Sequence, residues 1–165
     1  MTPSKHISLR SPVMEDGLGV WRLVACCPPL DANSSYCNML QCSHFAGTSV
    51  IAESDQIVGF ISAYKLPDRP DTLFVWQVAV GEEARGLGLA SRMLAELLAR
   101  PDCEKVRFLE TTITSNNKGS WALFDSLAKK MGVTCKSSPW LDKHKHFDGL
   151  HDSESLVRIG PFTHA

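Results

Sequence analysis

A glycine-rich loop between an apolar strand and a helix is the part of this sequence whose residue types point most directly to chemistry. Residues 74 to 84 form an apolar run and a short acidic turn, and residues 85 to 90 read Arg-Gly-Leu-Gly-Leu-Ala. Because such a loop has few side chains, a pyrophosphate can reach its backbone N–H groups at the positive end of the following helix. Arg85 adds a fixed positive charge. The expected donors are the N–H groups of Gly86, Leu87, Gly88 and Ala90.

Three classes of ligand use loops of this kind, and the residues separate them. A nucleoside triphosphate loop requires Gly-Lys-Ser/Thr, and the sequence contains no Gly-Lys pair. A dinucleotide fingerprint requires a third glycine, but Ala90-Ser91 follows Gly86-x-Gly88, so this match is weak. The remaining pattern, Arg85-x-x-Gly88-x-Ala90 after a strand that ends Val-Ala-Val, resembles the acetyl-coenzyme A signature of the GNAT superfamily of N-acetyltransferases. A turn that only lets strand and helix pack closely is the structural alternative.

Composition favours one globular domain over residues 1–165. Hydrophobic residues make up 44% of the 165 positions, which is enough for a sizeable core. The net charge of -1 gives no electrostatic reason to expect nucleic acid or an anionic membrane as a partner. No apolar run reaches the length of a membrane span, and no signal peptide pattern precedes the first strand. We therefore expect a cytoplasmic protein.

The six cysteines do not form a Cys-x-x-Cys pair, which argues against zinc and against a thioredoxin-like motif. Without a secretory signal, we expect reduced thiols that serve as small core residues. A cysteine nucleophile stays an alternative, although no cysteine lies with a histidine in a recognisable arrangement. The six are Cys26, Cys27, Cys37, Cys42, Cys103 and Cys135.

Hydrophobic periodicity and turn residues predict a mixed order of strands and helices. Strands are expected at residues 7–10, 48–53, 57–64, 72–80, 106–112, 133–136 and 156–159, with a hairpin turn at 54–56 and a Pro/Asp-rich turn at 67–71. Helices are expected at 14–25, at 34–45, from Ala90 to a stop at Pro101, and from Trp121 to an end at Gly132. This order resembles the GNAT fold. The resemblance implies an α/β (α+β) single domain whose mixed, largely antiparallel sheet is splayed at a bulged strand, with helices on both faces.

Five dispersed blocks extend the resemblance beyond the loop. They lie at residues 29–36, 44–50, 71–80, 109–114 and 146–154. Together they resemble the L-2,4-diaminobutyrate acetyltransferase family of ectoine synthesis. The resemblance implies acetyl transfer from acetyl-CoA, used as co-substrate without a metal, to the 4-amino group of L-2,4-diaminobutyrate, and it implies a homodimer.

The GNAT resemblance also implies roles for the strand that precedes the loop. A bulge near the strand end would splay the sheet and admit cofactor and amine from opposite sides. A backbone N–H near Val78 or Ala79 would face the thioester carbonyl and stabilise the charge that develops on its oxygen. Val80 would pair with the pantetheine arm like a strand. Asn117 would contact the cofactor from a later helix, on which Phe124 occupies the position of a tyrosine found in many GNAT enzymes.

Attack on a thioester requires a neutral amine, and an alkylamine with a pKa near ~10 is protonated at neutral pH. Many GNAT enzymes place a glutamate on the bulged strand, but Gln77 and Val78 stand here, and neither accepts a proton. Glu110 on the next strand is the candidate base, with an ion-paired or solvent-facing carboxylate as the alternative. Because Phe124 has no proton to give, Tyr36 is the candidate donor to the departing thiolate, with a packed aromatic as its alternative.

Recognition of a diamino acid requires anions and an aromatic face. Asp31 and Glu154 are the candidate carboxylates from the family-like blocks, and Trp76 can present its ring to an ammonium group. The structural alternatives are a helix cap for Asp31, core packing for Trp76 and a solvated strand-end charge for Glu154. Since Asn33 is the better cap in Asp-x-Asn-Ser-Ser, Asp31 is expected to be available for a ligand.

Histidines 144, 146 and 151 lack tetrahedral zinc spacing, so we expect a loop that closes over the substrate or reaches a partner subunit, without metal. Two other functions stay open. One is acetylation of another small diamine or amino acid, which would use the same glycine-rich loop. The other is a non-catalytic acetyl-CoA-binding module, which the missing glutamate and tyrosine would favour.

Overall fold

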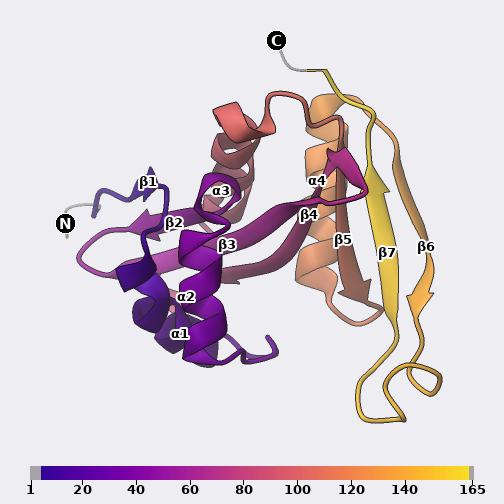
Figure 1. Cartoon of the computed structure of the whole chain (residues 1–165), viewed down its shortest axis with the longest axis horizontal. Coiled ribbons are helices and arrows are strands. Elements are labelled where there is room, and N and C mark those ends of the chain that lie inside the picture. The colour runs from indigo at the N-terminus through magenta and orange to yellow at the C-terminus, as the bar shows by residue number, and fades with distance from the viewer. Residues whose placement is uncertain (1–4, 164–165) are drawn as a thin grey trace. The chain divides into compact units, whose positions relative to one another are not determined.

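A computed structural model describes residues 5–163, which form seven strands and four α-helices (Figure 1). The strands follow the order β1-β2-β3-β4-β5-β7-β6 in one sheet, and this mixed architecture confirms the predicted fold. No described helix is long and apolar enough to cross a membrane. The elements are β1 (Ser8–Arg10), α1 (Gly17–Ala25), α2 (Ser35–Ser43), β2 (Val50–Glu53), β3 (Ile57–Leu66), β4 (Arg69–Val80), α3 (Leu89–Leu98), β5 (Phe108–Thr114), α4 (Lys118–Met131), β6 (Cys135–Leu141) and β7 (Glu154–Ile159).

The contacts of the chain divide it into two compact units. The first unit comprises residues up to Tyr64 together with Val75–Glu104, and the second comprises Lys65–Phe74 together with the residues from Lys105 onward. Strands β3 and β4 contribute residues to both units. A single domain over residues 1–165 stays a prediction.

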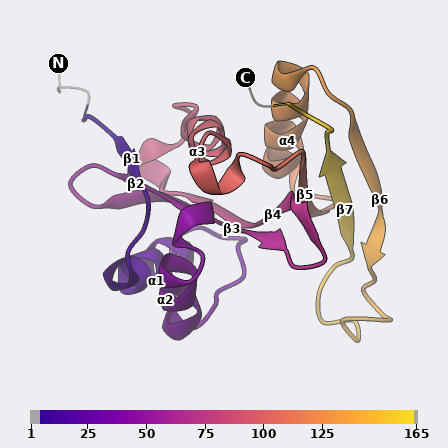
Figure 2. The ribbon, with the colours of Figure 1, turned by 45° about the horizontal axis from the view of Figure 1, so that its top comes forward.

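In the first unit, helices cover both faces of the strands, as the fold prediction required. Figure 2 shows α1 and α2 on one side of β2 and β3, and α3 on the other. Gly59 permits the close approach of α3, because a Cβ there would lie 3.0 Å from Cε of Met93. The core on the α1 and α2 side is formed by Val20, Leu23, Val24, Cys27, Cys42, Ile51, Phe60 and Ala79.

The second unit is built around three antiparallel strands in the order β5-β7-β6, with α4 beside them (Figure 1). The register places Glu110 opposite Arg158 and Thr114 opposite Glu154. Because successive strand residues point to opposite faces, Glu110 and Arg158 share a face that Leu109 and Ile159 do not. The fully buried residues Leu109, Val157 and Ile159 fill the core of this unit with Phe124 and Ala128 of α4.

Several predicted boundaries differ from those observed. The turn predicted at 67–71 spans only Pro67 and Asp68, because β4 already begins at Arg69 and accommodates Pro70 near its start. The strand predicted at 133–136 runs instead from Cys135 to Leu141, and as the last strand of the sheet it tolerates Pro139.

The cap of the second helix is also one residue later than predicted. Ser34 rather than Asn33 precedes α2, and its Oγ accepts the N–H of Cys37 at 3.0 Å. The helix ends at Ser43, and a 3-10 turn at Ala46–Thr48 replaces the start of the strand predicted from residue 48.

Candidate active site

The glycine-rich loop of the first unit has the backbone that its residues predict. Gly86 and Gly88 have φ angles of 76° and 70°, in the left-handed region that favours glycine. A Cβ at either position would have no heavy atom within 4 Å, so the packing of strand against helix does not require these glycines. The alternative of a turn made only for close packing is therefore wrong, and the space beside the loop is open to a ligand.

Helix α3 begins directly after this loop with its first N–H groups available. Gly88 is the residue before Leu89 and offers no side-chain cap. Leu87 is 61% exposed, and Ala90 in the first turn is half-buried. Uncapped N–H groups at the positive end of a helix bind anions, so the loop and the first turn fit the diphosphate of a coenzyme.

Arg85 lies on the strand side of the loop. Its Nε donates to the carbonyl oxygen of Val80 at 3.1 Å, and the thiol of Cys27 donates to the same oxygen at 3.4 Å. The guanidinium group is thereby held beside the loop while the side chain stays exposed. Since the Val80 carbonyl already has two donors, a strand-like contact of Val80 with a ligand would use its N–H group.

The end of β4 alternates between buried and more accessible side chains. Gln77 and Ala79 are buried, whereas Trp76 is exposed and Val78 is half-buried. The Ala79 side chain belongs to the core, so any role of this residue in a ligand site falls to its backbone.

A side-chain hydrogen bond links β4 to the loop between α1 and α2. Nε2 of Gln77 donates to the backbone carbonyl oxygen of Asp31 at 2.8 Å, across 46 residues of sequence. Gln77 is 8% exposed, and its Oε1 is buried without a hydrogen-bond partner among the described residues. Asp31 itself is exposed. The helix-cap alternative for Asp31 is wrong, because Ser34 caps α2.

Trp76 belongs to an aromatic group at the edge of the first unit. Its ring meets Tyr64 edge to face at 6.1 Å, and Tyr64 is 5.6 Å from Phe45. Burial raises the pKa of Tyr64, so its hydroxyl stays protonated at neutral pH. Trp76 is nevertheless 43% exposed, which leaves much of the indole accessible to a cation. The alternative that Trp76 serves only in core packing is therefore not supported.

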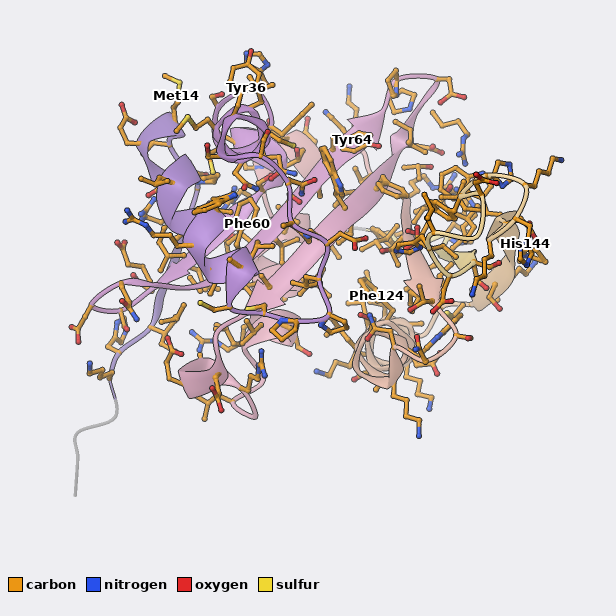
Figure 3. All side chains as sticks on the ribbon, turned by 90° about the horizontal axis from the view of Figure 1, so that it is seen from below. Met14, Tyr36, Phe60, Tyr64, Phe124 and His144 are labelled. Atoms are coloured by element: carbon orange, nitrogen blue, oxygen red, sulfur yellow. The ribbon has the colours of Figure 1, made fainter. Side chains whose placement is uncertain are left out.

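Tyr36 stands on the outer side of the first turn of α2, away from Phe60 of β3 (Figure 3). The side chain is 69% exposed, so the alternative of a packed aromatic is wrong. An exposed phenol can donate a proton to a ligand that approaches this end of the helix.

Glu110 in the second unit is almost fully buried and is held by two arginines. Nη1 and Nη2 of Arg69 donate to its two carboxylate oxygens at 3.0 and 3.1 Å, and Nη1 of Arg158 donates to Oε2 at 3.0 Å. Arg158 also donates to Thr72 at 3.3 Å and stacks 3.7 Å above the Phe108 ring. A general base requires an oxygen that is free to take a proton. The arrangement therefore favours the ion-paired alternative over the predicted base.

Three other predicted residues of the second unit have different surroundings. Oδ1 of Asn117 caps α4 by accepting the N–H of Ser120 at 3.2 Å, which leaves its amide nitrogen for a ligand. Phe124 is 2% exposed and has little surface to offer a cofactor. Glu154 is half-buried at the first position of β7, where it pairs with Thr114 and Leu141, so it is not a fully solvated charge.

The histidine loop between β6 and β7 uses its polar groups internally. The N–H of Asp142 donates to Nδ1 of His146 at 2.8 Å. The rings of His151 and Phe147 are in tilted contact, with centroids 4.6 Å apart. The Asp142 carboxylate accepts two backbone N–H groups, which lower its pKa. Figure 3 shows His144 at the outer rim of this loop. Within residues 5–163, no three His, Cys, Asp or Glu side chains form a group that could hold a metal.

None of the six cysteines, all of which lie within the described residues, forms a disulfide bond. Burial raises the pKa of Cys42 to about 12 and raises the pKa values of Cys37 and Cys135, so the thiolate that a nucleophile needs is disfavoured at these three positions.

Sequence reasoning misses the two arginines and the role of Gln77. Arg158 lies in a predicted strand, but Arg69 lies in a segment predicted as a turn, so their convergence on Glu110 is not visible from the sequence. Gln77 donates to a backbone carbonyl, a group that every residue carries, and no sequence pattern marks such a partner.

Comparisons with known proteins agree with the glycine-rich loop and the fold. Residues 20–128 match the acetyltransferase (GNAT) family. The chain is 57% identical over 157 residues to the L-2,4-diaminobutyric acid acetyltransferase of Methylotuvimicrobium alcaliphilum, covering 94% of this chain and 91% of the relative. It is 52% identical to the enzyme of the same name from Vibrio parahaemolyticus, covering 95% and 87% of the two chains.

Solved structures agree with the family match. Diaminobutyrate acetyltransferase from Paenibacillus lautus, in complex with its substrate L-2,4-diaminobutyric acid and coenzyme A, superposes with a TM-score of 0.94 at 40% identity, covering 98% of this chain and 99% of the other. The ribosomal-protein-S18-alanine N-acetyltransferase of Escherichia coli shares the fold alone, with a TM-score of 0.68 at 14% identity and 97% of each chain covered. The chain belongs to the acetyltransferase (GNAT) family and, within it, to the L-2,4-diaminobutyric acid acetyltransferases.

Proposed function

We propose that this chain transfers the acetyl group of acetyl-CoA to the 4-amino group of L-2,4-diaminobutyrate, giving N4-acetyl-L-2,4-diaminobutyrate for ectoine synthesis. The observation that carries the proposal is the near-complete superposition on a 40% identical enzyme whose substrate is L-2,4-diaminobutyric acid. The open glycine-rich loop supports the donor half of the reaction.

The residues of the first unit fit a coenzyme A diphosphate. Acetyl-CoA supplies the acetyl group as a thioester. The N–H groups of Gly86, Leu87, Gly88 and Ala90 would hold the diphosphate together with Arg85, because no Cβ and no cap competes for that space. A backbone N–H of Val78 or Ala79 would stabilise the charge that develops on the carbonyl oxygen, and the Val80 N–H would hold the pantetheine arm.

Asp31 and Trp76 of the first unit are the residues we propose for an ammonium group of the acceptor. Asp31 is exposed and opposite in charge, and the accessible Trp76 ring attracts a cation by about 1 to 2 kcal/mol when water is excluded. In the second unit, we propose Glu154 as a further carboxylate for an ammonium group of the substrate. We also propose that Asn117 contacts the coenzyme. Phe124 lies in α4 and is 2% exposed, so it would contribute to the coenzyme site only through the packing of this helix.

Proton transfer in this chain needs groups other than Glu110. Both oxygens of Glu110 accept arginine N–H groups, so removal of the amine proton falls to water. The exposed Tyr36 hydroxyl is the proposed proton donor to the departing thiolate. Since a thiol of pKa about 8.5 leaves readily, one hydrogen-bond donor is sufficient for that step.

We further propose that the protein is cytoplasmic and forms a homodimer. Size-exclusion chromatography with light scattering tests the dimer directly, and a monomer at micromolar concentration would contradict it.

Amine-dependent release of the coenzyme A thiol tests the reaction itself. The assay compares L-2,4-diaminobutyrate, ornithine, lysine and spermidine as acceptors, and we expect kcat/KM to be highest for diaminobutyrate. Higher kcat/KM for ornithine or spermidine would mean a different amine acetyltransferase. Coenzyme binding without thiol release from any amine would mean a non-catalytic binding module.

A further inference from the structure

Gln77 occupies an unusual position for a neutral amide. The side chain is buried, yet only one end of it is hydrogen-bonded, because Nε2 donates to the Asp31 carbonyl at 2.8 Å while Oε1 has no partner among the described residues. A buried acceptor without a partner lowers stability. A purely structural position would be better filled by an apolar side chain of the same size. The presence of a buried amide here therefore points to a task for the Nε2 donor.

The donor acts on the loop that carries Asp31. Within this loop the N–H of Leu30 donates to the Cys27 carbonyl, and Ser34 caps the next helix. The hydrogen bond from Gln77 fixes the backbone between these two points. It therefore sets the position of Asp31 relative to β4, the strand that carries Trp76.

A glutamate at position 77 could not perform this task in its charged form. A carboxylate has no hydrogen to donate, and its oxygens would face the Asp31 carbonyl oxygen with lone pairs only. Glutamine has the same shape as glutamate, and its amide supplies the N–H that this contact uses.

Resting on the function proposed above, we propose that Gln77 is a positioning residue for the acceptor amine. Its amide holds the Asp31 backbone, and through it the Asp31 carboxylate, where that carboxylate takes an ammonium group of the diamino acid. The substrate class that this arrangement selects is a small molecule with a second ammonium group besides the one that is acetylated. Coenzyme binding does not depend on it.

Two variants separate the donor from the shape of the side chain. Gln77→Glu keeps the shape and removes the donor at neutral pH, and Gln77→Met removes both polar ends. We expect each to raise KM for diaminobutyrate by about tenfold, the effect of losing one well-placed hydrogen bond. KM for acetyl-CoA should change by less than about twofold, as should all constants of the matched control Gln56→Glu at the exposed hairpin turn.

A double-mutant cycle shows whether Gln77 acts through Asp31. In an Asp31→Asn background the effect of Gln77→Met on KM should shrink to less than about threefold, because the group that it positions is already neutral. Additive effects of the two substitutions, or a loss confined to kcat, would overturn the proposal. Unfolding midpoints of all variants show whether a KM change reflects a loosened fold.

The pH dependence of diaminobutyrate binding gives a second signature. Once the introduced carboxyl group of Gln77→Glu is protonated, it can donate its O–H to the Asp31 carbonyl. The affinity of this variant should therefore approach that of the unchanged protein as the pH falls from about 8 to about 5. A defect that stays constant over this range would contradict the donor role. If another amine proves to be the preferred acceptor, the substrate proposal fails, while the same cycle measured with that amine still decides the role of Gln77.

Discussion

The two units of this protein differ in which of their buried polar side chains find hydrogen-bond partners. Among the described residues, every buried side-chain atom without a hydrogen-bond partner belongs to the first unit: Asn38 Oδ1, Gln41 Nε2, Ser62 Oγ and Gln77 Oε1. In the second unit the buried Glu110 carboxylate receives three arginine N–H groups. The first unit leaves four neutral polar atoms unsatisfied in its interior, while the second pairs a buried carboxylate with two arginines.

The difference follows from where the partners come from. In the second unit the antiparallel register sets Glu110 directly opposite Arg158, and Arg69 at the start of β4 completes the group. In the first unit the buried amides of Asn38 and Gln41 lie one helical turn apart and satisfy only one bond between them. A fully paired carboxylate is suited to holding strands together. An amide with one open end can still hold a loop, as Gln77 holds the Asp31 carbonyl.

Substitution of Glu110 should give the largest effect and should act on stability. In Glu110→Gln one oxygen is replaced by an NH2 group that faces an arginine donor, so we expect the free energy of unfolding to fall by about 3 kcal/mol. Urea unfolding at pH 7 measures it. The kcat of the folded protein should stay within about threefold of the unchanged enzyme, with the same pH profile, because Glu110 is engaged by arginines.

The matched control is Glu104→Gln, at an exposed position, which should leave stability unchanged within about 0.5 kcal/mol. A fall of kcat by a factor of about 100 or more in stable Glu110→Gln protein would make Glu110 the general base after all. The buried carboxylate of the second unit would then serve catalysis as well as stability.

Substitution of two glycines that share one backbone conformation, one in each unit, should lower stability less than Glu110→Gln does. The pair separates backbone strain from coenzyme binding. Gly88 and Gly132 have φ angles of 70° and 66°, and a Cβ at either would meet no atom within 4 Å. Valine at either position should lower the free energy of unfolding by about 1 to 2 kcal/mol through backbone strain alone. Only Gly88→Val should also weaken coenzyme A binding, by about tenfold or more, because its side chain enters the phosphate loop.

Isothermal titration with coenzyme A and urea unfolding measure the two effects separately. Equal losses of coenzyme affinity in Gly88→Val and Gly132→Val would show that general destabilisation, rather than the loop, controls binding. Gly132 ends α4 in the second unit, so Gly132→Val measures the effect of backbone strain on stability without changing the phosphate loop.

The sequence predicts those features that local patterns determine. Helix α3 carries Met93, Leu94, Leu97 and Leu98 at helical spacing, and all four are buried. The glycine-rich loop is equally local, because positive φ angles and a helix start can be read from neighbouring residues. Both are therefore predictable without knowledge of the rest of the chain.

Features that depend on register or on backbone acceptors are not predictable in this way. The group formed by Arg69, Glu110 and Arg158 requires three strands to align, and a shift of one residue would place Glu110 on the other face. The predicted β6 is too short because the exposed residues of this strand show no alternation between apolar and polar. Asn33 and Ser34 are both good caps, and tertiary contacts choose between them.

The smallest predicted effect concerns an arginine ion-pair group of the first unit, whose carboxylates are more exposed than Glu110 of the second. Arg10 donates to both Asp16 oxygens at 2.7 and 2.9 Å, and its Nε donates to Glu53 at 2.8 Å. The Asp16 and Glu53 side chains are 11% and 37% exposed, against 2% for Glu110, so water competes more strongly for these carboxylates. We expect Asp16→Asn to cost about 1 kcal/mol at pH 7, less than Glu110→Gln, because screening reduces the pair.

The pH dependence of this difference has a defined sign. The hydrogen bonds from Arg10 lower the pKa of Asp16 from its usual 3.8, so the folded state binds the proton less readily than the unfolded chain. The stabilisation is therefore complete above about pH 4 and is lost as the pH falls through the lowered pKa. Urea unfolding of the unchanged protein and of Asp16→Asn should differ at pH 7 and converge below pH 3.8. The control Glu15→Gln, at the exposed neighbouring position, should match the unchanged protein in stability at both pH values. If Asp16→Asn cost as much as Glu110→Gln at pH 7, exposure would not explain why the two arginine groups differ, and the contrast between the units would need another cause.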